Sequence, residues 1–248
     1  MRALVNASRA SLVANAPAIL QRRVRPLILP GLGRSFDIGL YVLVSSISPL
    51  RVYAYDRALV RVCEAPFPTS AAGFTAKDKS AFVINHYSPV WTLPFFARHL
   101  ASCDASAACA LRRALSAAGY DGAKLWRRME TIASTLLEAL RPHAELGLRR
   151  VGLGAEHAFE LFRFDFMVEE TGATPLLTEV NISPNLVAAH AEDGKVKAAL
   201  LKDTLRVVQA RLHGQRNVGY ASGAATAAKE ELAVAGGFRR IPVAGTYE

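Results

Sequence analysis

The 248-residue chain has a formal net charge of +9 at pH 7, and 51% of its residues are hydrophobic. That apolar fraction excludes a disordered chain, and the length suffices for one large domain or two small lobes. No apolar run reaches the roughly 18 residues of a membrane helix. The basic excess favours an acidic partner. Nucleic acid is not expected, because no zinc-finger, helix-turn-helix or RNA-binding motif is present.

The beginning of the chain allows two interpretations. Before Asp37 there is no acidic residue, but there are six arginines: Arg2, Arg9, Arg22, Arg23, Arg25 and Arg34. An Arg-rich, acid-free leader is typical of organelle transit peptides. The alternative is folded chain, because Ala18 to Leu29 has the composition of a strand.

The next elements are predicted to be strands. A turn over 30–33 leads into Ile38 to Val44, a continuous apolar strand that we expect to be buried on both faces. Leu50 to Tyr55 and Ala58 to Cys63 are predicted to form a hairpin around Asp56-Arg57.

A short strand at Ala81 to Tyr87 precedes a mostly helical region. Helices are predicted at Leu93 to Ser102 and at Ala107 to Ala118. Lys124 to Ala144 has apolar residues at helical spacing, which predicts an amphipathic helix that Pro142 shortens.

The three cysteines, Cys63, Cys103 and Cys109, have neither metal-site nor disulfide-framework spacing. We therefore expect free thiols and a reducing compartment such as the cytoplasm.

Two strands that follow carry the most informative polar residues. One strand contains Asp165, and the next contains Glu179 and Asn181, which share a face because strand side chains alternate. Pairing of these strands as a hairpin can bring Asp165 opposite that face. Three hard oxygen donors would then converge, which suits Mg²⁺. The alternative is a surface hairpin with ordinary acids.

The C-terminal part is predicted to contain one further amphipathic helix, at Val196 to Leu212. Gly219 to Ala228 has few large side chains and is predicted to be a loop or linker.

Seven segments, in the right order, resemble motifs of the tubulin–tyrosine ligase-like family. They resemble FDLRxYVLVTS, PLRIYLY…GLxRF, HLTNYS, FELFGFDFM, LLEVNxSPSL, VK…L…D and GGFxRIFP. The corresponding segments here are Phe36 to Val44, Pro49 to Arg61, Asn85 to Tyr87, Phe159 to Met167, Leu177 to Pro184, Val196 to Asp203 and Gly236 to Pro242. The similarity covers roughly residues 18 to 242 and is greatest to tubulin polyglutamylases.

The resemblance implies an α+β, ATP-grasp-like fold with a mostly antiparallel sheet flanked by helices. It implies that MgATP phosphorylates a carboxylate and that an amine then attacks the acyl phosphate. In polyglutamylases that amine belongs to free L-glutamate, and the acceptor is a glutamate in the acidic tail of tubulin. ATP and Mg²⁺ are the implied cofactors. The implied location is the cytoskeleton, including the cilium or basal body, without a membrane partner.

The resemblance also implies roles for individual residues. Three match magnesium ligands, one matches a catalytic, phosphate-contacting arginine, and six match nucleotide-binding positions. The magnesium ligands are Asp165, Glu179 and Asn181, and the arginine is Arg61. The nucleotide-binding positions are Gln21, Arg22, Arg23, Val24, Asp37 and Asn85. Structural alternatives are plain sheet for the first four nucleotide positions, a strand-edge cap for Asp37, a solvated arginine for Arg61, and a turn residue for Asn85 and for Asn181, which precedes Ser183-Pro184.

Several positions depart from the family motifs, and four of them lie near the expected nucleotide site. Ser35 stands where the family has lysine, and Gly39 where it has arginine; Phe82 and Ile84 replace histidine and threonine. The N-terminal lobe with its phosphate-binding lysines has no counterpart.

Three hypotheses remain open: a glutamylating ligase, an inactive relative that binds microtubules, and an organelle ligase with another substrate. The expected division is a leader or lobe remnant (1–17), the C-terminal part of the catalytic domain (18–212) and a C-terminal extension (213–248).

Overall fold

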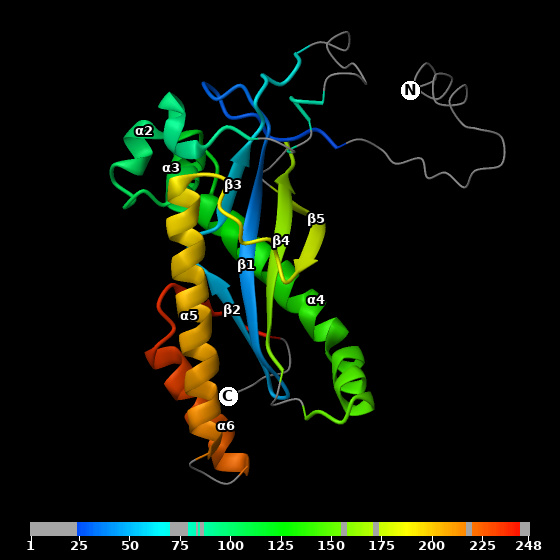
Figure 1. Cartoon of the computed structure of the whole chain (residues 1–248). Helices are drawn as coiled ribbons and strands as arrows, with labels where there is room; N and C mark the ends of the chain where they lie inside the picture. The colour runs from blue at the N-terminus through cyan, green and yellow to red at the C-terminus, as the bar shows by residue number, and fades with distance from the viewer. Residues whose placement is uncertain are drawn as a thin grey trace, which may run out of the picture.

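The computed structural model describes residues 24–69, 79–82, 84, 87–154, 158–170, 174–216 and 220–243, without the side chains of 213–225 (Figure 1). Its strands are β1 (Phe36–Ile47), β2 (Leu50–Tyr55), β3 (Leu59–Val62), β4 (Glu160–Val168), β5 (Pro175–Ile182) and β6 (Phe238–Arg240). Its helices are η2 (Val90–Thr92), α2 (Pro94–Leu100), α3 (Ala107–Ala117), α4 (Gly122–Arg150), α5 (Ala191–Arg216) and α6 (Tyr220–Ala233).

The strands form one sheet in the order β5-β4-β1-β2-β6, and β3 also pairs with β1. The paired strands are antiparallel. Helix α4 lies against one face of the sheet and α5 against the other (Figure 1). The prediction of an α+β protein with a mostly antiparallel sheet between helices is therefore confirmed.

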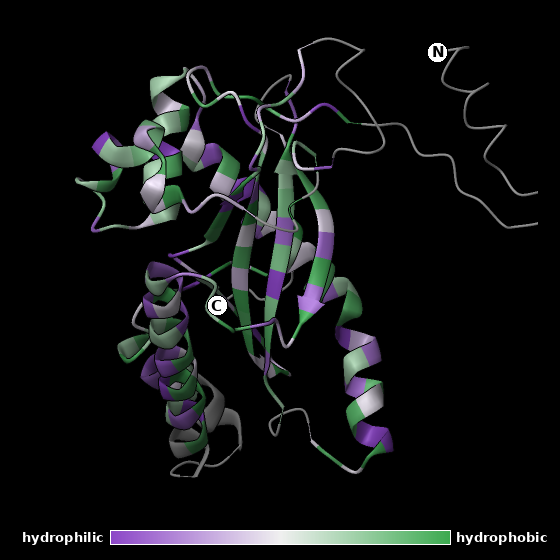
Figure 2. Ribbon diagram, turned by 45° about the horizontal axis from the view of Figure 1, so that its top comes forward, coloured by the Kyte–Doolittle hydropathy of each residue, from purple (hydrophilic) through white to green (hydrophobic). Residues whose placement is uncertain are grey.

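The central strand β1 is buried on both faces, as its apolar sequence predicts. Alternate residues such as Ile38, Leu40 and Val42 join a large core with α3 and α4. Tyr41 and Leu43 point the other way into a smaller core with α5. Side chains of β1 therefore alternate between the two faces as far as the register irregularity between Val44 and Ser46. Figure 2 shows the central strands as ribbons coloured by hydropathy among the flanking helices.

The predicted hairpin between β2 and β3 is wrong. Both strands pair with β1 and lie end to end along its edge, with Ala54 opposite Val42 and Val60 opposite Ile38. The chain reverses at Ser48-Pro49, between β1 and β2. Asp56-Arg57 lies between β2 and β3 and does not reverse the chain, because both strands run antiparallel to β1.

Two predictions about helices are also wrong. Helix α4 continues through Pro142 to Arg150. Proline removes one backbone hydrogen bond, but this half of α4 is largely exposed, so water can satisfy the freed carbonyl. The described part of the predicted linker at Gly219 to Ala228 belongs to α6, because alanine, the residue that made it look featureless, is the best helix former.

The strand expected at Ala81 to Tyr87 is not formed where the structure describes it, because Ala81 and Phe82 lie in a turn. The predicted strand at Ala18 to Leu29 is described from residue 24 onward. There the chain is extended but makes a single bridge, between Pro26 and Glu169.

The expectation of three free thiols is wrong for two of the cysteines. Cys103 and Cys109 form a disulfide, and Cys63 is a buried free thiol. Asp104 and Ala105 adopt positive φ angles, so the chain turns tightly between α2 and α3 and brings the two Cα atoms to 5.6 Å. Spacing alone did not reveal this turn.

No helix within the described ranges is long and apolar enough to cross a membrane.

Candidate functional site

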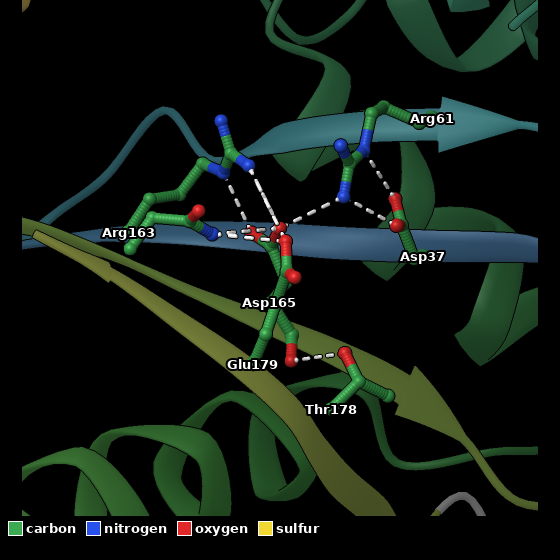
Figure 3. Close-up of polar contacts among 7 residues, drawn as sticks. Asp37, Arg61, Arg163, Asp165, Thr178 and Glu179 are labelled. Carbon is green, nitrogen blue, oxygen red and sulfur yellow. Dashed lines mark hydrogen bonds and ion pairs between the residues drawn. The ribbon is translucent and has the colours of Figure 1, made fainter. Parts of the chain in front are cut away.

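Four neighbouring strands bring six polar side chains together on the α5 side of the sheet (Figure 3). Register explains the meeting, because Asp37 faces Arg61 across β1 and β3, while Asp165 faces Glu179 across β4 and β5. We call this group the open cluster; its members are Asp37, Arg61, Arg163, Asp165, Glu179 and Asn181.

Arg61 links two carboxylates of the open cluster. Its Nε donates to Asp37 Oδ1 at 2.8 Å, and its Nη2 donates to Asp37 Oδ2 at 2.5 Å and to Asp165 Oδ2 at 3.0 Å. The side chains of Arg61 and Asp37 are 15% and 17% exposed. A guanidinium fork held in this way is preorganised, so Arg61 is positioned to meet an anion with little loss of conformational entropy.

Asp165 lies at the centre of the cluster and is 1% exposed. Arg163 grips it with two hydrogen bonds, from Nε to Oδ1 at 2.6 Å and from Nη2 to Oδ2 at 2.8 Å. Figure 3 shows Arg163 and Arg61 approaching this carboxylate from two sides. Two carboxylates and two guanidinium groups thus balance each other's charge at the centre of the site.

The two buried carboxylates differ in acidity. Burial raises the pKa of Asp37 to about 6, against the opposing hydrogen bond and charge of Arg61. Burial would also raise the pKa of Asp165, but the hydrogen bond from Arg163 and the charge of Arg61 outweigh it, so that pKa lies below its ordinary value. Asp165 is therefore ionised at neutral pH, which the predicted magnesium role requires.

Glu179 and Asn181 complete the cluster at its solvent side. The Asn181 Nδ2 donates to Glu179 Oε1 at 3.0 Å and to Asp165 Oδ2 at 3.3 Å, so the amide and both carboxylates converge. Glu179 is 59% exposed. Rotating the Asn181 amide by half a turn would bring its carbonyl oxygen to the same point.

This donor set fits Mg²⁺, which binds oxygen ligands and usually keeps several waters. Within the described ranges, no group of three or more His, Cys, Asp or Glu side chains is arranged to hold a metal ion. The candidate set is a different one, with two carboxylates and one amide. The magnesium role of these three residues remains a prediction.

Four of the residues expected to bind nucleotide lie outside the described residues: Gln21, Arg22, Arg23 and Asn85. Val24 is described. The carbonyl of the next residue, Arg25, accepts a hydrogen bond from the amide of Glu170, just after the end of β4. This places Val24 beside the β4–β5 connection and not in the open cluster.

Arg163 is the residue of the cluster that sequence reasoning missed. It stands two positions before Asp165 on the same strand, so alternation alone puts both side chains on one face. This alternation is the sequence signal that identifies Arg163 as a neighbour of Asp165. The position is also one where the family motif FELFGFDFM has glycine.

An apolar cavity of about 500 Å³ lies away from the open cluster, between the second half of α4 and the sheet. Leu137, Leu140, Phe159 and Phe162 are among its lining residues. Arg141, His143 and Glu160 also border it, but its lining is mostly apolar, in contrast to the open cluster.

Comparison with known proteins supports the resemblance found in the motifs. The family model described as "Tubulin-tyrosine ligase family" matches residues 5–216. The "Probable tubulin polyglutamylase ttll-15" of Caenorhabditis elegans is 30% identical over 69% of this chain and 32% of its own length. The "Probable tubulin polyglutamylase TTLL9" of Rattus norvegicus is 31% identical over 79% of this chain and 40% of its own length.

A further relative, the "Tubulin polyglutamylase ttll-5" of Caenorhabditis elegans, is 30% identical over 81% of this chain and 28% of its own length. The chain thus spans less than half the length of each of these relatives. The family model nevertheless matches most of the chain, and the motifs predicted the same family. The chain belongs to the tubulin-tyrosine ligase family.

Proposed function

We propose that this chain acts in an ATP- and Mg²⁺-dependent ligase that adds glutamate to the acidic C-terminal tails of tubulin. The observation that carries the proposal is the convergence of Asp165, Glu179 and Asn181 beside Arg61. Phosphoryl transfer needs positive charge where negative charge develops, and a metal with an adjacent arginine meets that need.

Five residues of the cluster have a part in this proposal. Asp165, Glu179 and Asn181 hold Mg²⁺, which neutralises phosphate charge when it is bound. Arg61, held in place by Asp37, contacts the transferred phosphoryl group. We also propose that residues 21–24 contact adenine and that Asn85 contributes to the nucleotide site, as in the family motifs.

The charge of the chain fits the proposed acceptor. A net charge of +9 attracts a glutamate-rich tail, and salt should weaken that attraction. An acceptor of this kind would place the protein at the cytoskeleton. The relatives reported above are named as polyglutamylases, which favours a ligase over an inactive module that only binds microtubules.

Glutamate transfer tests the proposal directly. The chain is incubated with MgATP, labelled L-glutamate and tubulin, and incorporation into tubulin is counted. We expect incorporation that needs ATP and stops when the acidic tails are removed by limited proteolysis. Tubulin binding without incorporation, unchanged by ATP, would favour the inactive relative instead.

A further inference from the structure

Gly39 and Arg163 are neighbours across the sheet, and one makes room for the other. Gly39 of β1 pairs with Asp165 of β4, and Arg163 pairs with Tyr41, so both positions face the open cluster. A Cβ atom added at Gly39 would lie 2.9 Å from Arg163 Cδ, 3.1 Å from Asp165 Oδ1 and 3.3 Å from Arg163 Cγ. The Arg163 side chain therefore occupies the space that any larger residue at position 39 would fill.

The Arg163 guanidinium is held at the edge of the cluster. Its two bonds to Asp165 fix the fork, and the side chain remains 11% exposed. Glu179, on the solvent side, lies 3.9 Å from Arg163 Nη2. The group thus stands next to the proposed metal ligands with an edge that solvent can reach.

The two positions have exchanged residue types relative to the family motifs. The motif FDLR has arginine at the place of Gly39, and FELFGFDFM has glycine at the place of Arg163. In the sequence, glycine at position 39 means that one arginine of the motif is lost. In the structure, the guanidinium of Arg163 enters the space beside position 39 from the neighbouring strand.

We propose that Arg163, seated over Gly39, replaces the arginine that position 39 lacks and binds an anionic group of the substrate at the open cluster. This inference rests on the function proposed above. The group is either a phosphoryl or a carboxylate group, since a guanidinium fork recognises both. Asp165 orients the fork, and glycine at position 39 leaves room for it, because a Cβ atom there would crowd both the Arg163 and Asp165 side chains.

An exchange of the two residues tests the proposal. Binding of a non-hydrolysable ATP analogue with Mg²⁺, of MgADP and of L-glutamate is measured by calorimetry for wild type, Arg163→Gly, Gly39→Arg and the double exchange. Arg163→Gly should weaken one of these ligands about 10- to 100-fold. Gly39→Arg alone should also weaken it, because two guanidinium groups would compete for one space.

The double exchange carries the decisive result. Restored affinity, to within about threefold of wild type, is expected, because the guanidinium returns from the other strand. If Arg163→Gly loses affinity for the ATP analogue but not for ADP, Arg163 binds the terminal phosphoryl group. If it loses affinity for glutamate, Arg163 binds a carboxylate.

Three outcomes overturn the inference. Wild-type affinity in Arg163→Gly, or a double exchange no better than the weaker single variant, contradicts the role of Arg163 alone. If wild type binds none of the three ligands, the proposed function fails as well. Thermal unfolding of all four proteins separates loss of binding from loss of the fold.

Discussion

The α5 side of the sheet holds two charged clusters of similar composition and opposite accessibility. The closed cluster consists of Ser45, Arg51, Tyr53 and Glu231. Arg51 donates to both Glu231 oxygens at 3.0 Å, and Tyr53 and Ser45 donate to Glu231 Oε2 at 2.6 and 3.1 Å. Its central ion pair is 2% and 0% exposed.

The open cluster uses the same kind of arginine–carboxylate pairs but ends in Glu179, which is 59% exposed. In the closed cluster four partners satisfy one another, and the arrangement fixes α6 to the sheet. In the open cluster the arginine forks and the Glu179 carboxylate remain within reach of a ligand. The two clusters therefore differ in the exposure of their outermost side chains more than in their residue types. The buried cluster has a structural role, and the exposed one can bind a ligand.

The largest expected effect is on the closed cluster. Glu231→Ala leaves Arg51 as an unpaired buried charge and should lower the free energy of unfolding by about 3–5 kcal/mol, measured in urea. The control is Glu230→Ala on the same helix, at a half-buried position, with an expected loss of under about 1 kcal/mol. Equal losses in the two variants would remove the distinction between the clusters.

An intermediate effect is expected at the arginine that links the open cluster. Arg61→Ala removes the partner of Asp37 and should cost about 1–3 kcal/mol in urea, less than Glu231→Ala because water can reach the freed carboxylate. The same variant should lose nucleotide binding. A stability loss as large as that of Glu231→Ala would show that the open cluster is structural too.

A smaller effect on stability is expected at the rim. Glu179→Gln changes an exposed side chain and should alter the free energy of unfolding by no more than about 0.5 kcal/mol. The urea midpoint and slope should match those of wild type. A loss above about 2 kcal/mol would mean that Glu179 supports the hairpin.

Thiol counting tests how far solvent penetrates beneath the open cluster. Burial and the charge of Asp37 raise the pKa of the fully buried Cys63 thiol to about 11, so it should not react at pH 8 in the native protein. A thiol reagent should count none in the native state, one after unfolding, and three after unfolding and reduction. A native count of one would show an accessible Cys63, and two further thiols without reduction would contradict the Cys103–Cys109 disulfide.

The local parts of the fold and site could be predicted from the sequence, because alternation within a strand is a local property. It placed Glu179 and Asn181 on one face, and the short connection between the two strands predicted that β4 and β5 pair. The partner of a strand is not local, so the reversal at Ser48-Pro49 was missed and β3 was paired with β2. The residue that fills the space beside Gly39 also comes from another strand, so position 39 alone does not predict the contact with Arg163.

The most direct test of the account is the affinity for ATP of wild type and Glu179→Gln, each measured with Mg²⁺ and with EDTA. A Glu192→Gln variant, changed in a surface pair with Lys195, serves as the control. We predict that wild type and the control bind ATP only with Mg²⁺ and that Glu179→Gln binds at least about tenfold more weakly while staying folded. Equal MgATP affinity in wild type and Glu179→Gln would contradict the assignment of the open cluster as the metal–nucleotide site.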